Sequence, residues 1–487
     1  MAIPTTILNW IGGHETPAAS GTTFDNLNPH DGSRLCGVAR SGADDVQQAI
    51  EAAKRAQPAW AELTPVSRGD WVRQIALKMR DRRDEIANLV ALETGKSKKL
   101  ALGEADAAIE MGLFVAGEGR RNYGRTMPAS MAHRQVLTVR QPLGIAGLII
   151  SFNTPMPNIA WKVFPAIFCG NTAVLKPSED TPLAAWIFGQ ICAEVGLPDG
   201  VLNIVHGYGN EAGIPLVESP AVKLVSFTGS YETGRKIQKV AGERLAKVCL
   251  ELGGKNALVV CDDADLDNAV NWVMQAAFSN AGQRCAAASR IIIFDSVYNL
   301  FRDKLIKAVR EVNIGSTDAD FMGPVINERQ LSKLEAAVNQ ATNDGATLLT
   351  GGSRLTDPTH KNGFYMAPTL LDNASPDAVI SQDELFGPVA VLYRVSGFDE
   401  ALALANHSSY GLTSSIHTAS LHRAMRFAEQ VEAGVVVVNG GTHGSEPHMG
   451  FGGLKNSGTG WREAGVEALD VYSDWKYINI ISDPKKV

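Results

Sequence analysis

Apolar residues along the chain follow two different spacings, and the change between them divides the sequence. In the first hundred residues they recur every three or four positions, over Ala43–Ala59 and Ser67–Thr94, which predicts a mainly helical region. From Ile145 onward, short apolar runs alternate with helical stretches, an order typical of a parallel, doubly wound sheet. The strands predicted in this first series are Ile145–Ile150, Thr172–Leu175, Val201–Val205, Lys223–Phe227 and Lys247–Leu250.

A second alternating series begins after about Gly253 and predicts another α/β domain, with a ligand-binding cleft between the two domains. Two further segments, Arg134–Arg140 and Leu469–Ile481, have the pattern of extended strands but fit neither series. Strands of this kind are usually paired with another strand. The strands predicted in the second series are Asn256–Cys261, Ser289–Phe294, Val389–Tyr393 and Val435–Asn439.

The composition narrows the choice of partners. Of 487 residues, 45% are hydrophobic, which is enough for the cores of two or three domains. The 52 acidic and 45 basic residues give a net charge of -7, which argues against a nucleic-acid partner. Apolar stretches are short and no signal-peptide pattern is present, so we expect a cytoplasmic protein without a membrane partner. Six cysteines are scattered without a CxxC pair or a ligand cluster, so we expect no metal site.

Two residues at element junctions could carry chemistry. Cys285 follows a helical stretch and precedes a predicted strand, and a nucleophilic thiol needs such an accessible position. The alternative is that it packs like most cysteines. Glu251 ends a predicted parallel strand and is followed by Gly253 and Gly254, so its carboxylate is expected to point into the cleft. The alternative is a carboxylate that caps a turn or a helix.

Several segments at the same sheet edge are compatible with nucleotide binding. Gly229 and Ser230 lie where a strand runs into a helix, and such a helix N-terminus offers unpaired N–H groups to a phosphate. The segment His206–Gly213 is closer to a GxGxxG pattern, but its third glycine falls one residue late. Lys176 and Glu179 follow another strand, and a carboxylate there accepts hydrogen bonds from ribose and repels a 2′-phosphate. Each segment alone is a weak indication, and an exposed charge pair is the alternative for Lys176 and Glu179.

Other reaction classes lack their motifs. The sequence has no HExxH, no Walker lysine motif and no G-x-S-x-G elbow, so metal-dependent hydrolysis, phosphoryl transfer and serine hydrolysis are not supported. Oxidation is the chemistry that best uses a thiol, a carboxylate and a nucleotide site together.

Seven short motifs, taken in order, resemble those of the aldehyde dehydrogenase superfamily of the hydrolytic, non-acylating type. The resemblance covers nearly the whole chain, from about Ile11 to Ile481. Because seven motifs match in the same order, the resemblance is strong although each match alone is weak. The motifs are Phe152–Pro155, Lys176–Glu179, Phe227–Ser230, Glu251–Gly254, Gly282–Cys285, Glu384–Pro388 and Phe451–Gly453.

The resemblance implies a fold and an assembly. The expected fold is α/β, with two doubly wound parallel-sheet domains, one Rossmann-like and cofactor-binding and one catalytic, plus a small β-arm for oligomerisation. The cofactor-binding domain would take residues 1–125 and 142–253, the catalytic domain 254–447, and the arm 126–141 and 468–487. Residues 448–467 would return to the cofactor-domain side. The arm implies a homodimer or homotetramer.

The resemblance also assigns catalytic roles. Cys285 would attack an aldehyde to form a thiohemiacetal, and Asn153 with the Cys285 N–H would hold the oxyanion. Hydride loss would leave a thioester, which water activated by Glu251 would hydrolyse to the carboxylic acid. Lys162 and Glu463 would relay protons. A coenzyme A-acylating relative would lack a base at Glu251, and a catalytically silent relative would lack Cys285 and Asn153, so both are weaker hypotheses.

NAD is the implied cofactor, with NADP as the alternative. Glu179 favours NAD because its charge repels the 2′-phosphate of NADP. Lys176 and Glu179 would bind the adenosine ribose, Gly229 and Ser230 the pyrophosphate, and Glu384 the nicotinamide ribose, with Phe386 nearby. The full implied set of cofactor contacts is Lys176, Glu179, Gly209, Gly229, Ser230, Leu252, Glu384 and Phe386.

The substrate tunnel is expected to be mainly apolar and aromatic, which favours a small apolar or aromatic aldehyde. A short-chain carboxylate semialdehyde is the alternative, because Arg284 and His448 could bind an anion, although semialdehyde enzymes tend to have arginine where Trp161 stands. The chain departs from the commonest family pattern at Ser151 and Phe152, usually Pro and Trp, which affects the shape of the tunnel. The implied tunnel residues are Met111, Phe114, Phe152, Trp161, Arg284, His448 and Phe451.

Overall fold

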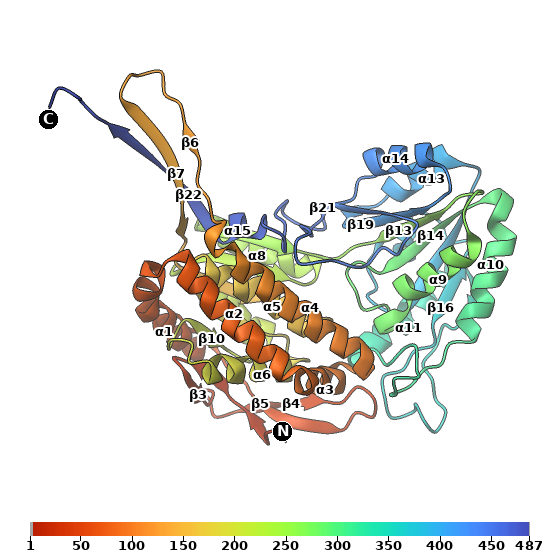
Figure 1. The fold of residues 1–487 in the computed structure, drawn as a ribbon. Helices are drawn as coiled ribbons and strands as arrows, with labels where there is room; N and C mark the ends of the chain where they lie inside the picture. Colours follow the sequence, from red (N-terminus) through yellow and green to blue (C-terminus); the bar gives the residue numbers. More distant parts are fainter. Residues whose placement is uncertain (1–2, 487) are drawn as a thin grey trace.

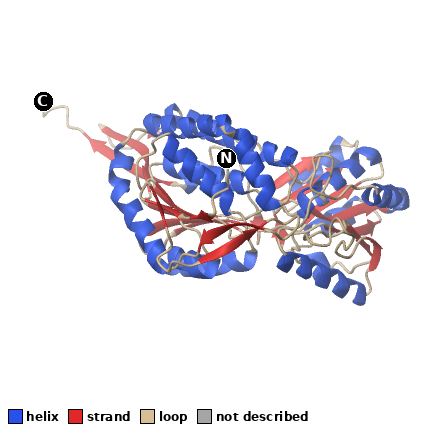
Figure 2. Cartoon of the chain, turned by 90° about the horizontal axis from the view of Figure 1, so that it is seen from below, coloured by secondary structure: helices blue, strands red, loops and turns tan. Residues whose placement is uncertain are grey.

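The computed structural model describes residues 3–486, which form two α/β domains and a projecting β-ribbon (Figure 1). In each domain helices lie on both faces of a central sheet, and the two sheets lie side by side along the long axis of the molecule (Figure 2). The predicted fold class is confirmed. The residue limits predicted for the domains stay a prediction.

The first sheet contains the five strands predicted between Ile145 and Leu250, each within two residues of its expected ends. They are parallel to one another because each returns through a helical crossover. Two short antiparallel strands that the sequence did not indicate extend the sheet at one edge. The strand order is β12 (Lys247–Glu251), β11 (Val222–Thr228), β8 (Ile145–Ile149), β9 (Thr172–Lys176), β10 (Leu202–Ile204), β2 (Asn9–Ile11) and β3 (His14–Thr16).

Helices cover this sheet, and their starts follow from local chemistry. Helix α1 (Ala43–Glu62) begins after Gly42, whose N–H donates to the carboxylate of Asp45 at 3.0 Å. The segment Ser67–Thr94 is two helices, α2 (Pro65–Asp81) and α3 (Arg83–Thr94), because Arg82 leaves helical geometry between them. The remaining helices of this domain are α4 (Lys98–Gly117), α5 (Pro155–Phe168), α6 (Pro182–Glu194), α7 (Ile214–Glu218) and α8 (Tyr231–Glu243).

The expectation of a mainly helical first hundred residues is only partly right. A separate small sheet formed by β1 (Thr6–Ile7), β5 (Arg34–Ala39) and β4 (Thr23–Leu27) precedes the first helix. Its strands are short, and β4 alternates exposed and buried residues without a long apolar run, so apolar spacing did not reveal it.

The second sheet contains the four predicted strands of the second series and three more. Its strand order is β15 (Thr347–Thr350), β16 (Thr369–Asp372), β17 (Val389–Val395), β14 (Ala288–Phe294), β13 (Asn256–Val260), β19 (Thr413–His417) and β20 (Val435–Val438). The helices of this domain are α9 (Leu266–Ala277), α10 (Asp295–Arg310), α11 (Glu328–Asn343), α12 (Val379–Gln382), α13 (Phe398–Asn406) and α14 (Leu421–Gln430).

The two predicted extended segments pair with each other. Strand β7 (Arg134–Pro142) runs antiparallel to β22 (Ser473–Ile481), and β6 (Thr126–Met127) flanks β7. The last strand begins at Ser473 instead of Leu469, because Ala468–Val471 form a short helical turn, α15. Figure 1 shows the ribbon extending beyond the body of the molecule.

The relative position of the sheets produces the cleft. The carboxyl edge of the first sheet ends in Lys176, Thr228 and Glu251, which close β9, β11 and β12. Cys285 lies just before β14, at the amino edge of the second sheet. The two edges face the same hollow, as its lining residues show. Within residues 3–486, no helix is both long and apolar enough to span a membrane.

Candidate functional site

A hollow of about 820 Å³ lies between the two sheets and brings together most of the predicted site residues. It is lined by the β8–α5 loop, the β11–α8 junction, the end of β12, the turn before β14 and the loop before β17. The predicted residues that line it are Phe152, Asn153, Trp161, Gly229, Ser230, Glu251, Leu252, Arg284, Cys285, Glu384, Phe386, Phe451 and Glu463.

An unusual turn presents Cys285 to the hollow. Asn280, Ala281 and Gly282 all have left-handed backbone conformations, with φ of 56°, 53° and 65°. A side chain at Gly282 would collide with the carbonyl oxygen of Gly387, 2.2 Å away, so only glycine fits there. Asn256 Nδ2 then donates to the Cys285 carbonyl oxygen at 2.8 Å and fixes the start of β14.

Among the cysteines of the described chain, Cys285 is the one that is half-buried, whereas the other five are buried. Burial of its sulfur in the cleft raises the pKa of the thiol to about 12, and the negative charges of Glu384 and Glu251 act in the same direction. The backbone N–H groups of Cys285 and Ala286 lower the pKa but do not compensate. The resting side chain is therefore a neutral thiol that needs a base to become a nucleophile.

Asn153 lies in the loop between β8 and α5 with its side-chain oxygen already engaged. Asn158 Nδ2 donates to Asn153 Oδ1 at 3.4 Å and to the Ser151 carbonyl oxygen at 3.2 Å. This contact orients the Asn153 amide so that its NH₂ group is the part left to donate into the hollow. Such a donor suits a developing oxyanion.

Glu251 is a buried carboxylate without a partner. It is 5% exposed, and neither of its oxygens accepts a hydrogen bond. Burial raises its pKa well above the usual range, and the charge of Glu463 raises it further. An unpaired carboxylate that lines a cleft costs stability, and such groups are concentrated at functional sites. Glu251 is therefore a candidate to accept a proton in the cleft.

Behind Glu251 lies a buried hydrogen-bond network that contains both predicted relay residues. Lys162 Nζ donates to Glu463 Oε1 and, at 2.9 Å, to Ser226 Oγ. Ser226 in turn donates to Glu463 at 2.8 Å, and the Tyr472 hydroxyl donates to Ser226 at 3.1 Å. Sequence reasoning missed Ser226 and Tyr472. A polar residue inside the apolar run of β11 was the available indication for Ser226.

The residues on the first sheet's edge, together with Glu384 in the loop before β17, fit a dinucleotide. Ser230 caps α8, and its Oγ accepts from Thr233 N at 3.4 Å, so the positive end of a four-turn helix faces the hollow. Glu384 accepts from Gly254 N at 3.0 Å, and burial raises its pKa to about 7. Lys176 Nζ contacts Glu179 at 3.2 Å at the end of β9. These groups supply donors for a pyrophosphate and acceptors for ribose hydroxyls.

Three predicted cofactor residues, Lys176, Glu179 and Gly209, do not line the hollow itself. They follow β9 and β10, the next strands along the same carboxyl edge, where an extended ligand would continue. Lys162 also lies outside the hollow, fully buried next to Glu463.

The substrate side of the hollow is aromatic with one cation. The rings of Trp161 and Phe451 are 5.5 Å apart. Arg284 Nη1 donates to Ser279 Oγ at 2.6 Å. The nearest acid, Glu104, forms its ion pair with Lys96 instead. Within residues 3–486, Arg284 therefore forms no ion pair of its own.

Three predicted tunnel residues do not reach the hollow. Met111 is fully buried in the core of the first domain, Phe114 packs against that core, and the His448 side chain is 61% exposed near Glu446. The family resemblance indicates which positions correspond to tunnel residues, but it does not show which face of α4 lies toward the cleft. The cleft is lined instead by Gly103, Glu104 and Ala107 of α4 and by His443.

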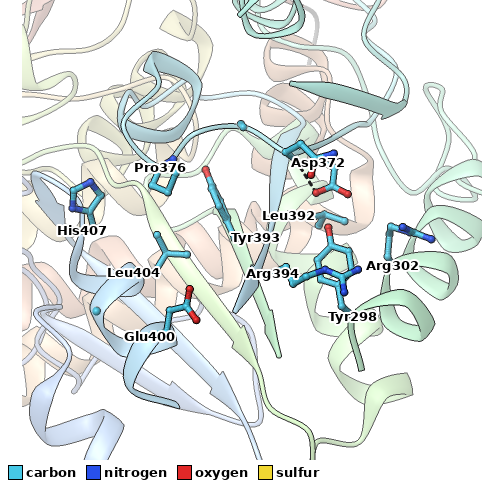
Figure 3. Close-up of a pocket in the computed structure, with 13 residues that line it drawn as sticks. Tyr298, Arg302, Asp372, Pro376, Leu392, Tyr393, Arg394, Glu400, Leu404 and His407 are labelled. Atoms are coloured by element: carbon cyan, nitrogen blue, oxygen red, sulfur yellow. Dashed lines mark hydrogen bonds between the residues drawn. The ribbon is translucent and has the colours of Figure 1, made fainter. Parts of the chain in front are cut away.

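A second hollow, of about 760 Å³, lies at the other edge of the second sheet (Figure 3). Its two arginines are paired, because Arg394 contacts Asp295 and Arg302 contacts Asp303. None of the predicted site residues lines it. The first hollow, which holds the thiol and the unpaired carboxylate, is therefore the candidate active site.

A two-domain α/β architecture with a cysteine, a buried carboxylate and a nucleotide-binding edge in one cleft defines a class of dehydrogenases that use a covalent intermediate. The family model described as the aldehyde dehydrogenase family matches residues 16–478, and the chain belongs to this family.

Individual relatives match over nearly their whole length. The chain is 37% identical to α-ketoglutaric semialdehyde dehydrogenase of Bacillus subtilis, over 97% of this chain and 98% of that protein. It is 36% identical to succinate-semialdehyde dehydrogenase [NADP(+)] of Escherichia coli, over 96% and 97%. The structure of betaine aldehyde dehydrogenase of Staphylococcus aureus in complex with NAD+ superposes with a TM-score of 0.96 at 34% identity, covering 98% of this chain and 95% of that one.

Proposed function

We propose that the protein oxidises an aldehyde to its carboxylic acid with NAD as the hydride acceptor, through a thioester on Cys285. The observation that carries this proposal is the shared cleft, in which the one accessible thiol and the unpartnered carboxylate of Glu251 lie together beside a nucleotide-binding edge. The family membership supports it.

In the first half of the reaction, Sγ of Cys285 bonds to the aldehyde carbon and its proton passes to Glu251. The carbonyl oxygen becomes an oxyanion that accepts hydrogen bonds from the Asn153 side chain and the Cys285 N–H. A donor of this kind contributes about 3 kcal/mol to the transition state. When bound, NAD accepts the hydride that leaves the former aldehyde carbon.

Before the second half, Glu251 passes the thiol proton on to solvent, and its free carboxylate then accepts a proton from a water molecule whose oxygen attacks the thioester. The carbon–sulfur bond breaks, the carboxylic acid leaves, and Cys285 regains its proton. Glu463 and Lys162 lie next to Glu251 and offer the proton a route toward the interior network. Glu251 also argues against a coenzyme A-acylating enzyme, which would not need to activate water, and Cys285 with Asn153 argues against a silent relative.

NAD is favoured over NADP by Glu179. Its carboxylate, paired with Lys176 on the edge of the first sheet, would accept from ribose hydroxyls and repel a 2′-phosphate. NADP stays the alternative, since the Escherichia coli relative is named for it. A kcat/KM for NADP that exceeds the value for NAD would overturn this preference.

For the substrate, Arg284 supports an aldehyde with a distal carboxylate. A half-buried guanidinium that forms no ion pair with the described residues favours an anionic ligand. This reverses the order expected from the sequence, where an apolar or aromatic aldehyde came first. The names of two relatives, both semialdehyde dehydrogenases, agree with the new order. An apolar or aromatic aldehyde remains the second candidate, because Trp161 and Phe451 form an aromatic wall.

The test is NADH formation across a panel of aliphatic, aromatic and ω-carboxylate aldehydes, with NAD and NADP offered separately. Activity that disappears in Cys285→Ala would support the reaction class. If hexanal or benzaldehyde exceeded succinic semialdehyde by about tenfold in kcat/KM, the substrate order would be wrong. NADH release without acid product, unless coenzyme A is added, would favour the acylating alternative.

We also propose a homodimer or homotetramer. Strand β22 forms the outer edge of the projecting ribbon, and its Tyr477 and Ile481 are 64% and 65% exposed. An edge strand with exposed apolar residues is usually covered by a partner. A monomer mass by light scattering at micromolar concentration would refute this. Cytoplasmic localisation stays a prediction.

A further inference from the structure

Lys96 is a buried lysine that contacts the main chain of the oxyanion residue. It follows Gly95, which ends α3 in a left-handed conformation, and it is 4% exposed. Its Nζ donates to the backbone carbonyl oxygen of Asn153 at 2.8 Å and forms an ion pair with Glu104 of α4. Residue 96 is thus connected to a loop that lies 57 positions further along the chain.

The same carbonyl oxygen also contacts the cysteine segment. Asn280 Nδ2 donates to it at 3.3 Å and to the Gln283 carbonyl oxygen at 3.2 Å. Asn280 belongs to the left-handed turn that presents Cys285. One acceptor atom on Asn153 therefore joins three segments, the α3–α4 connection, the β8–α5 loop and the turn before the nucleophile.

Stability alone does not account for a lysine at this place. A buried ion pair gains little over apolar residues of similar size, because both charges lose their hydration. Glu104 Oε2 has no hydrogen-bond partner, so the pair is not fully satisfied. What Lys96 adds, and an apolar side chain could not, is a donor directed at the Asn153 carbonyl.

We propose that Lys96, held by Glu104, is a positioning residue that fixes Asn153 relative to Cys285, so that the Asn153 amide meets the oxyanion. The proposal rests on the proposed aldehyde oxidation. Without the Lys96 contact, the loop between β8 and α5 keeps only the longer Asn280 bond to this carbonyl. A displacement of about 1 Å in a catalytic group can reduce a rate by about a hundredfold.

The first variant is Lys96→Met, which keeps the length of the side chain and removes the donor. We expect kcat for aldehyde oxidation at saturating NAD to fall by about 10- to 100-fold, with little change in KM. Alkylation of Cys285 by iodoacetamide forms no oxyanion, so its rate should stay within about twofold of wild type. A general disturbance of the site would slow both reactions.

A double-mutant cycle separates positioning from an independent effect. In the Asn153→Ala background the amide is absent, and Lys96→Met should then cost less than about threefold in kcat. If the two losses multiply, if Lys96→Met alone costs less than about tenfold, or if alkylation slows in parallel, the proposal is wrong.

A second variant is used if Lys96→Met does not fold. Lys96→Met combined with Glu104→Leu removes both members of the ion pair together, and apolar replacement of such a pair is usually tolerated. For this double variant we expect the same fall in kcat, and the double-mutant cycle with Asn153→Ala is carried out in the same way. Wild-type activity is measured first, so an enzyme that oxidises no aldehyde refutes the proposed function, whereas an active wild type with unaffected variants refutes the role of Lys96 alone.

Discussion

Replacement of Arg284 by methionine tests the substrate class most directly. Glu104 forms its ion pair with Lys96, and within residues 3–486 Arg284 forms no ion pair and donates a hydrogen bond to the neutral Ser279 hydroxyl. A substrate carboxylate would supply the missing counter-charge. Methionine keeps much of the apolar length of the side chain and removes the charge.

The expected loss in kcat/KM follows from the hydrogen bond between Arg284 and the substrate carboxylate, which the substitution removes. A hydrogen bond to a charged group contributes about 1.5–3 kcal/mol, which corresponds to about a 10- to 150-fold loss in kcat/KM for succinic semialdehyde. Glu104 would remain near the substrate and repel its carboxylate, so the loss should fall in the upper part of this range. For an uncharged aldehyde of similar length, such as hexanal, kcat/KM should stay constant or rise, because a buried charge no longer needs to be desolvated.

The assay is initial-rate NADH formation with both aldehydes at saturating NAD. Arg302→Met is a matched control, since it removes an arginine from the second hollow, where the guanidinium is already paired with Asp303. It should leave both kcat/KM values unchanged. Equal losses for succinic semialdehyde and hexanal in Arg284→Met would refute the reasoning, because they would indicate a structural role for Arg284 instead of carboxylate recognition.

Four further results are expected. Glu251→Gln should turn over about 10²- to 10⁴-fold more slowly and show no fast first equivalent of NADH in a rapid-quench experiment, because the carboxylate that accepts both the thiol proton and the water proton is lost; a full steady-state rate would contradict this. Glu179→Ala should raise the ratio of kcat/KM for NADP over NAD, measured from initial rates, and an unchanged ratio would exclude Glu179 as the discriminating group. Because the pKa of Cys285 is raised to about 12, the thiolate fraction and the iodoacetamide alkylation rate of the free enzyme should increase about tenfold per pH unit between about pH 7 and 10, whereas a plateau near pH 9 would indicate an ordinary thiol. Glu93→Ala should lower the free energy of unfolding in urea by about 2–5 kcal/mol, because the buried Glu93 carboxylate accepts from two backbone N–H groups at the start of α6, and a change below about 1 kcal/mol would show that water replaces it.

Most of the strands that the sequence predicted for the two large sheets have mainly apolar, buried residues. Ile145–Ile149 and Asn256–Val260 are buried on both faces, as parallel strands between helices must be. Strand β19 (Thr413–His417) is equally buried but was not predicted, because its middle residues are serines. Ser414 Oγ donates to the Ala257 carbonyl oxygen at 3.0 Å and Ser415 Oγ to the Gly440 carbonyl oxygen at 2.6 Å. These long-range bonds satisfy the hydroxyls, and no local pattern reveals them.

Site residues, like the strands, were predicted where a local pattern was sufficient and were missed where their role depends on long-range contacts. Cys285 and Glu251 became candidates because they stand next to strand ends, and the resemblance to the aldehyde dehydrogenase superfamily then assigned their roles. Lys96, Ser226 and Tyr472 were not predicted, since their roles depend on contacts with residues far away in the sequence. Local chemistry at each of these positions favours the ordinary interpretation of a surface lysine or a core residue.

The raised pKa of Cys285 explains why the cleft combines a thiol with two buried carboxylates. Burial of the sulfur, together with the charges of Glu384 and Glu251, holds the thiol in its neutral form, which is a poor nucleophile toward stray electrophiles and oxidants. The pKa of Glu251 is itself raised well above the usual range, so the proton of the thiol can move to this carboxylate when an aldehyde is in place. In this arrangement the thiol gains reactivity only while its carbon target and the Asn153 amide are present to stabilise the resulting charge. Variants that displace Asn153 should therefore lose turnover while leaving the unreactive resting thiol unchanged.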